Sequence, residues 1–70
     1  MDTGGIPDII ICLCGRFVAI ELKAGDNVPT ERQLMTMQLI NKAKGLAVPC
    51  WSLEAVQEAL TPILKEYYNK

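Results

Sequence analysis

The sequence of 70 residues contains no histidine. This absence excludes a Ser-His-Asp triad, a zinc site with histidine ligands and an imidazole general base. A long hydrophobic run is missing as well, because the longest, Ile9 to Leu13, is far shorter than the roughly 20 residues that a membrane-spanning helix needs. The sequence therefore predicts neither histidine chemistry nor a membrane span.

A strong excess of charge is also lacking. The net charge is −1, whereas proteins that bind nucleic acid mainly through phosphate contacts are usually basic. A bound metal ion would cancel part of the negative charge of the carboxylates that hold it. The composition therefore argues neither for nor against binding of nucleic acid. The three cysteines are an odd number in a chain without a signal peptide, which predicts free thiols in a reducing cytoplasm.

Apolar residues are plentiful for so short a chain. They make up 50% of the sequence, but a single domain of this size buries only roughly 60% of the surface that its unfolded chain exposes. We therefore expect one small domain, with part of its apolar surface covered by a second subunit in a homodimer.

The first half of the sequence predicts a β-hairpin. Strands are expected over about 8–14 and 16–23, joined by Cys14-Gly15 as a two-residue loop that pairs Leu13 with Arg16. Both strands are apolar on both faces, which predicts central strands that are covered on each side by helices or by a partner. Residues 24–29 are expected to form a loop, where substrate contacts are common.

The second half predicts a helix, a strand and a helix. Thr30 and Gln33 form a capping box at the start of the first helix, which should end at Gly45. A short strand over 46–51 contains Pro49, which favours an edge position or a bulge. Ser52 caps the last helix, and Thr61-Pro62 should kink it or split it in two. The fold class is therefore α/β, a β-hairpin–helix–strand–helix with a small mixed sheet flanked by helices.

The predicted hairpin register places Asp8 directly opposite Glu21. Opposed residues point to the same face with their Cβ atoms roughly 4.5–5.5 Å apart, so two carboxylates there repel each other unless a cation lies between them. A divalent cation with oxygen ligands is the natural candidate. Strand alternation sends Lys23 to the same face as Glu21. Two acids and a lysine around a hard cation are typical of a site that cuts phosphodiesters.

These residues resemble a known nuclease signature. Pro7-Asp8 followed by Glu21-Leu22-Lys23 is similar to the PD-(D/E)XK motif. Gly5-Ile6-Pro7-Asp8, the Gly15 turn, Ile20 to Lys23 and Thr30-x-x-Gln33 resemble more narrowly the VRR-NUC family, which includes small stand-alone phage and bacterial members. The resemblance covers about residues 4–48. Members usually begin with a helix and a further strand, and neither is visible here, so we expect a minimal or truncated restriction-endonuclease-like core.

The resemblance implies a function and assigns roles to residues. Asp8, Glu21 and the backbone carbonyl of Leu22 would hold Mg²⁺ or Mn²⁺, and Lys23 would position water and stabilise charge on the phosphate. Gln33 would help to hold the water or Lys23. The expected activity is endonucleolytic cleavage of DNA, structure-specific for branched DNA such as four-way junctions, by a homodimer with two active sites.

Each assignment has a simpler alternative in the sequence. Asp8 can cap a turn after Pro7, Glu21 can form a salt bridge with Lys23 or Arg16, and Lys23 can be a solvated strand end. Gln33 already has a capping role. The aromatic side chains can stack on bases, but packing in the core or in a dimer is favoured; they are Trp51, Tyr67 and Tyr68.

Two other functions remain open at this level. One is a PD-(D/E)XK domain that has lost catalysis and binds DNA or protein. The other is a small structural α/β interaction domain whose acids form only surface pairs.

Overall fold

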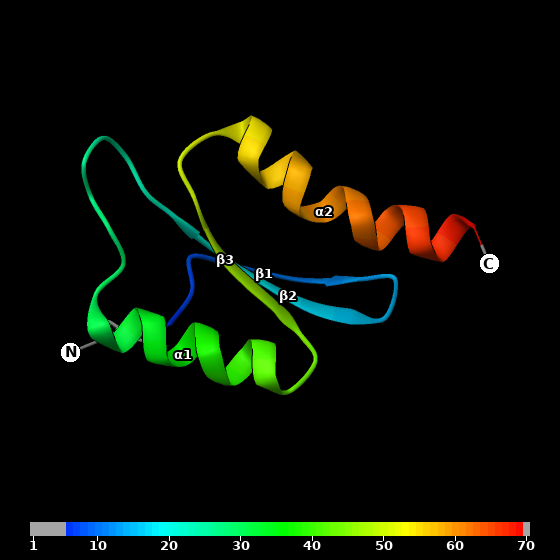
Figure 1. Ribbon diagram of the computed structural model, residues 1–70, viewed down its shortest axis with the longest axis horizontal. Helices are drawn as coiled ribbons and strands as arrows, with labels where there is room; N and C mark the ends of the chain where they lie inside the picture. Colours follow the sequence, from blue (N-terminus) through cyan, green and yellow to red (C-terminus); the bar gives the residue numbers. More distant parts are fainter. Residues whose placement is uncertain (1–5, 70) are drawn as a thin grey trace.

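A computed structural model of the chain describes residues 6–69, and its elements follow the predicted order (Figure 1). The elements are β1 (Ile9–Leu13), β2 (Arg16–Leu22), α1 (Glu31–Lys42), β3 (Leu46–Cys50) and α2 (Leu53–Tyr68). The strands form one mixed sheet in the order β1-β2-β3. The prediction of a small α/β domain with a mixed sheet and flanking helices is therefore confirmed. Gly4 and Gly5, which belong to the quoted motif, lie outside the described residues.

The hairpin of β1 and β2 has the predicted turn and register. Leu13 pairs with Arg16 and Ile9 with Ile20. The loop residues Cys14 and Gly15 have φ angles of 53° and 81°, and positive φ at both central residues is the requirement of a type I′ turn. The turn type fixes the register, and the register fixes which side chains face each other further along the strands.

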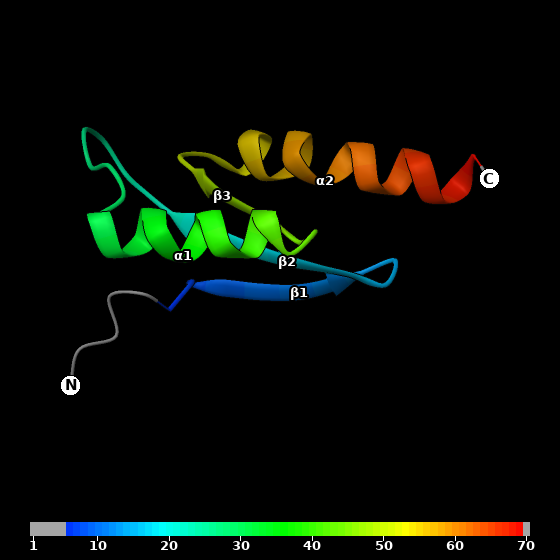
Figure 2. The ribbon, with the colours of Figure 1, turned by 60° about the horizontal axis from the view of Figure 1, so that its bottom comes forward.

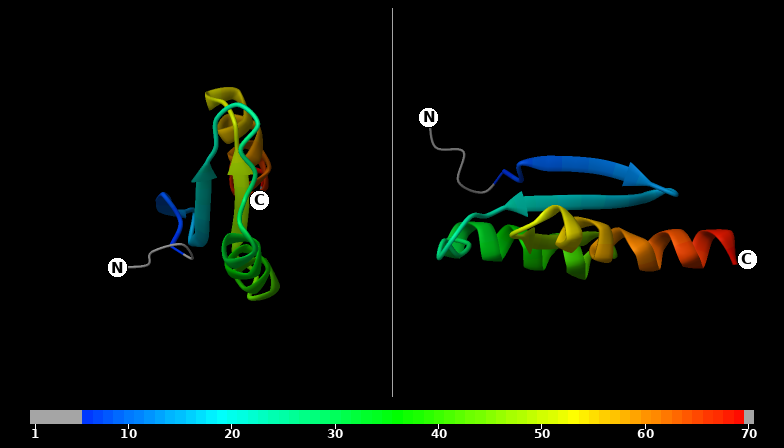
Figure 3. Two further views of the ribbon diagram at one scale, coloured as in Figure 1. Left: turned by 90° about the vertical axis from the view of Figure 1, so that its left-hand side faces the viewer. Right: turned by 90° about the horizontal axis from the view of Figure 1, so that it is seen from above.

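The helices cover opposite faces of the sheet, but only over part of its width. Figure 3 (left) shows α1 and α2 on either side of the sheet, near β3, with β1 standing beyond them. One face carries a core cluster that comprises Val18, Ile20, Cys50 and Ile63, and the other face carries Ala19, Met37 and Ala47. The central strand β2 therefore contributes to both clusters.

Within this chain, the prediction that helices cover both hairpin strands on each side is wrong for β1, and cover by a partner stays a prediction. Only β2 is central, and β1 is an edge strand with largely exposed side chains; Ile10 retains 56% of its accessible surface. A run of apolar residues shows that a strand can be covered, but not what covers it, and here both helices pack over β2 and β3. The predicted edge position of Pro49 is confirmed, because β3 is the other edge of the sheet.

Helix α1 has the predicted capping box, although it ends slightly differently from the prediction. Thr30 Oγ1 accepts a hydrogen bond from Gln33 N at 3.1 Å, and Gln33 Oε1 accepts one from Thr30 N at 3.0 Å. The left-handed residue at the C-terminal end is Lys44 (φ 76°) rather than Gly45. Gly45 is required for another reason: a Cβ there would lie 2.9 Å from Ile40 Cγ2.

Helix α2 is one continuous helix, so of the two outcomes predicted at Thr61-Pro62, a kink or a split, the split is wrong (Figure 1). Proline removes one backbone donor from the helix. In the turn of the helix before the proline, the Thr61 hydroxyl donates a hydrogen bond to the carbonyl of Gln57 at 2.7 Å. Packing of this amphipathic helix against the sheet, with Ile63 buried directly after the proline, keeps the two halves together.

The aromatic residues do not pack in the core of this chain, so the core alternative is wrong and packing in a dimer stays a prediction. Trp51, Tyr67 and Tyr68 are all exposed in this single chain, because they lie after the last strand and at the far end of α2, away from both core clusters. Exposed apolar side chains are frequent across the surface, as the composition predicted. Within residues 6–69, no helix is long and apolar enough to cross a membrane.

Candidate active site

The predicted pair of acids lies at the end of the hairpin where β1 begins and β2 ends (Figure 2). Asp8 directly precedes β1, and Glu21 is the second-to-last residue of β2. Because Ile9 pairs with Ile20, the next step of the register brings Asp8 to Glu21, and the Asp8 carboxyl group is close enough to raise the pKa of Glu21. The predicted meeting of the two acids is therefore confirmed.

The Asp8 carboxylate is fixed by the main chain of β2. Its Oδ2 accepts a hydrogen bond from the backbone N–H of Leu22 at 2.8 Å. This bond lies across the hairpin and not within a local turn, so Asp8 is more than a cap for the turn after Pro7. Since the N–H and C=O of a strand residue point to the same side, the Leu22 carbonyl also faces the side on which Asp8 lies.

Glu21 is buried although it is an acid. It retains 3% of its accessible surface and is the one buried charged side chain among the described residues. Burial, and after it the neighbouring Asp8 carboxylate, raises the pKa of Glu21 above its ordinary 4.5, whereas Lys23 lowers it. An ionised carboxylate in such a position is costly unless it is paired or bound to a cation.

Gln33 connects the acid to the lysine. Its Oε1 accepts a hydrogen bond from Lys23 Nζ at 2.8 Å, and its Nε2 donates to Glu21 Oε1 at 3.4 Å. The same Oε1 accepts the Thr30 N–H of the capping box. Gln33 therefore has both of the functions that the sequence left open, because the cap fixes the side chain that bridges the site.

Lys23 is held in place and is not a freely solvated strand end. It follows β2 directly, its backbone N–H donates to the Cys50 carbonyl at 2.9 Å, and its side chain is half-buried. The simple salt-bridge alternatives for Glu21 are not favoured, since the ammonium group of Lys23 donates to Gln33, and Arg16 lies at the other end of β2. The ammonium group is thereby kept beside the acid pair.

The donor set fits a hard divalent cation. No group of three or more His, Cys, Asp or Glu side chains that suits a metal gathers within residues 6–69, so a cation here would have two carboxylates, of Asp8 and Glu21. The Leu22 carbonyl, which faces the same side, is a third oxygen. Mg²⁺ commonly binds through one or two carboxylates and keeps several waters, and the unfavourable charge on buried Glu21 is what a cation would relieve.

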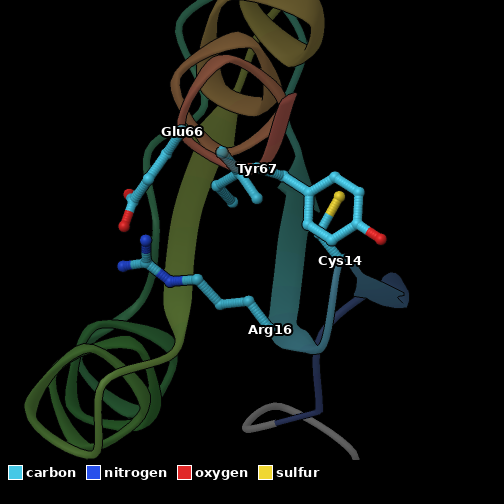
Figure 4. Close-up of a pocket in the computed structure, with 5 residues that line it drawn as sticks. Cys14, Arg16, Glu66 and Tyr67 are labelled. Atoms are coloured by element: carbon cyan, nitrogen blue, oxygen red, sulfur yellow. The ribbon is translucent and has the colours of Figure 1, made fainter. Parts of the chain in front are cut away.

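A small cavity of about 90 Å³ lies at the opposite end of the sheet, between the hairpin turn and the end of α2. Figure 4 shows the Arg16 guanidinium reaching toward the Glu66 carboxylate, with Cys14 and Tyr67 on the other side. Arg16 donates to the Gly45 carbonyl at 3.5 Å, and its buried Nε has no hydrogen-bond partner among residues 6–69. The Glu66 carboxylate would repel an anion, so the site at the acid pair is the stronger candidate.

One contact near the site was not predicted from the sequence. Trp51 Nε1 donates to the Asn27 carbonyl at 2.9 Å, which connects the loop after β2 to the end of β3. No local signal identifies this pair, because the two residues are 24 positions apart.

Comparisons of the chain with protein-family models, with curated proteins and with solved structures find no match. Support for a function therefore comes from the motif and from the geometry of the site.

Proposed function

We propose that the chain is a metal-dependent nuclease that hydrolyses phosphodiester bonds in DNA, with a restriction-endonuclease-like core of the VRR-NUC type. One observation carries this proposal: the buried Glu21 carboxylate lies against Asp8, and Gln33 connects it to the ammonium group of Lys23. A small domain gains no stability from burying an acid beside a second acid. The arrangement is useful if a cation and a phosphate bind there.

Asp8, Glu21 and the Leu22 carbonyl are the residues that would hold Mg²⁺ or Mn²⁺. When bound, such an ion polarises a phosphoryl oxygen and lowers the pKa of a coordinated water. The chain supplies the orientation: the Leu22 N–H fixes Asp8, and Gln33 fixes Glu21. These hydrogen bonds hold both carboxylates in place before a ligand arrives.

Lys23 supplies positive charge to the phosphate that is being cut. In the part of the chain that the structure describes, its ammonium group has one hydrogen bond, to Gln33, and keeps donors for phosphate oxygens. A fixed cation beside developing negative charge stabilises the transition state more than the ground state. Gln33 is a positioning residue in this mechanism, because it acts through Lys23 and Glu21.

The proposed substrate is branched DNA, such as a four-way junction, and the proposed active form is a homodimer. The exposed edge of β1 supports a second copy, since it carries neither a charged residue nor a proline to prevent strand pairing, and its Ile10 is exposed. A two-fold dimer would present two acid pairs to a symmetric substrate. Light scattering at micromolar concentration should give the dimer mass, and a monomer mass would contradict this part of the proposal.

Mn²⁺ binding tests the site directly. We expect calorimetry to show saturable binding that is lost in Asp8→Ala and kept in Asp26→Ala, a matched removal of an exposed acid from the neighbouring loop. Cleavage should then be assayed on junctions, flaps and single strands with Mg²⁺ or Mn²⁺. Binding without cleavage of any substrate would favour a domain that has lost catalysis. Absence of Mn²⁺ binding would favour a structural interaction domain.

A further inference from the structure

A second cavity of about 410 Å³ lies between the ends of β2 and β3 and the start of α2, and its lining includes Leu22 and Lys23, which follow Glu21 in the chain. Its lining is mostly apolar, with one positive charge at the rim. The lining residues that matter here are Ile9, Leu22, Trp51, Leu53, Val56 and Lys23. A concave apolar surface with a single charged group is typical of a small-molecule or cofactor site.

Trp51 lines this cavity and is partly exposed. The side chain retains 45% of its accessible surface, and its only donor, Nε1, is already bonded to the Asn27 carbonyl. The indole therefore has no polar group left to satisfy. Leu53, which follows it on the cavity wall, is 69% exposed. What this surface can offer a ligand is stacking and apolar contact.

The cavity adjoins the acid pair through two consecutive residues. Leu22 and Lys23 line the cavity, and they also serve the site, since the Leu22 N–H binds Asp8 and the Lys23 ammonium group binds Gln33. Glu21 and Leu22 point to opposite faces of the sheet because strand side chains alternate. A chain of nucleotides with one phosphate at the acids would have to cross the end of β2, from the face of Glu21 to the face of Leu22, to bring a neighbouring base to the cavity.

From this arrangement we infer that the cavity binds an unpaired nucleobase, stacked on Trp51, next to the phosphate that is cut. The inference deepens the proposed function and rests on it. Binding of single strands combines positive charge along the backbone with aromatic rings that stack on bases, and Lys23 with Trp51 supplies both within one cavity. A base within a duplex is stacked and paired, so it cannot enter. Among branched DNAs, the cavity would therefore favour those with an unpaired nucleotide beside the scissile bond, such as a flap or a junction with an unpaired base at its branch point, over a fully paired junction.

The test uses Trp51 as its own reporter, because it is the only tryptophan in the chain. The intact protein is titrated with single-stranded oligothymidylate and with an abasic oligonucleotide of equal length. The buffer contains Ca²⁺ in place of Mg²⁺ or Mn²⁺ so that binding is measured without cleavage, and a gel verifies that both strands remain uncut. We expect the base-bearing strand to quench the tryptophan emission and the abasic strand to bind more weakly without quenching. Equal quenching by both strands, or quenching by neither, would overturn the inference.

Variants separate stacking from general binding, with anisotropy of labelled oligothymidylate as the readout. Trp51→Ala should weaken binding by about five- to 150-fold, the range for loss of one stacked base. Trp51→Phe should retain most of the affinity. Tyr68→Ala, which removes an exposed aromatic ring from the far end of α2, should change it less than twofold. Equal effects of Trp51→Ala and Tyr68→Ala would contradict the inference, with circular dichroism as a check that both variants are folded.

The two proposals fail in different ways in these experiments. Cleavage that survives Glu21→Gln would contradict the proposed function, whereas quenching of Trp51 requires no cleavage and can be read on the same variant. Emission that changes with protein concentration in the absence of DNA would mean that a second copy fills the cavity, and would overturn the inference about a nucleobase.

Discussion

Replacing Lys23 by alanine tests the mechanism most directly. The substitution removes the ammonium group that lies 2.8 Å from Gln33 Oε1. It leaves the rest of the local structure in place, because Gln33 keeps its hydrogen bond from Thr30 N at 3.0 Å and its contact with Glu21. Any loss of activity can therefore be assigned to the missing charge and not to a broken helix cap.

The expected effects differ in size for catalysis, stability and metal binding. Losing one electrostatic group that acts in the transition state costs roughly 2.7–4 kcal/mol, about a hundred- to a thousand-fold in rate. The hydrogen bond to Gln33 is partly exposed and its acceptor keeps a second donor, so the free energy of unfolding should fall by only about 1 kcal/mol.

Metal binding should respond in the opposite direction. Lys23 lowers the pKa of Glu21, and therefore its removal raises that pKa further. Above the raised pKa, Mn²⁺ should bind Lys23→Ala as well as the parent or better, because a nearby positive charge opposes a cation. Below it, protons should compete with Mn²⁺ more strongly in the variant than in the parent.

Single-turnover cleavage of a junction at saturating Mn²⁺ measures the effect. Lys65→Ala, which removes an exposed lysine from the last turn of α2, is the matched control and should cut at the rate of the parent. A rate for Lys23→Ala within about threefold of the parent, a barrier change of roughly 0.65 kcal/mol, would refute the assigned role. Only the two acids would then remain in the mechanism.

Three further predictions concern single residues. Glu21→Gln should abolish cleavage. In urea unfolding, the free energy of unfolding of the parent should fall as pH rises from 4.5 through the raised pKa of Glu21, because the ionised carboxylate is buried, and that of the variant should not fall. Above that pKa, the variant should therefore be more stable than the parent. Gly45→Ala should destabilise the fold by about 1–3 kcal/mol, since the new Cβ would lie 3.0 Å from a backbone oxygen; an unchanged midpoint of thermal unfolding would contradict this. Cys50 should react with a thiol reagent more slowly than Cys12 and Cys14, because it is buried and burial raises its pKa; equal rates for all three would contradict its burial.

Local sequence signals determined the hairpin and the meeting of the acids. Cys14-Gly15 permits a type I′ turn, the turn fixes the register, and the register carries Asp8 to Glu21. The capping box of Gln33 and the edge position of Pro49 follow in the same way from the backbone chemistry of those residues. These predictions succeeded because each depends on residues that are close in sequence or connected by a tight turn.

Tertiary packing decided what covers each element. The apolar sequence of β1 is compatible with a central strand, and the strand lies at the edge because both helices pack over β2 and β3. Pro62 stays within one helix because the sheet supports both halves of α2. Burial of these segments depends on contacts between elements far apart in the chain, which a local pattern does not contain.

The site shows the same division. The sequence alone determined which residues carry the charges and that two of them face each other. Only the tertiary structure decided that Glu21 is 3% exposed, that Gln33 joins it to Lys23, and that Trp51 stands at the wall of an adjoining cavity. The physical reason is that a charge is set by its own side chain, whereas its pKa and its partners depend on the solvent that the rest of the fold excludes.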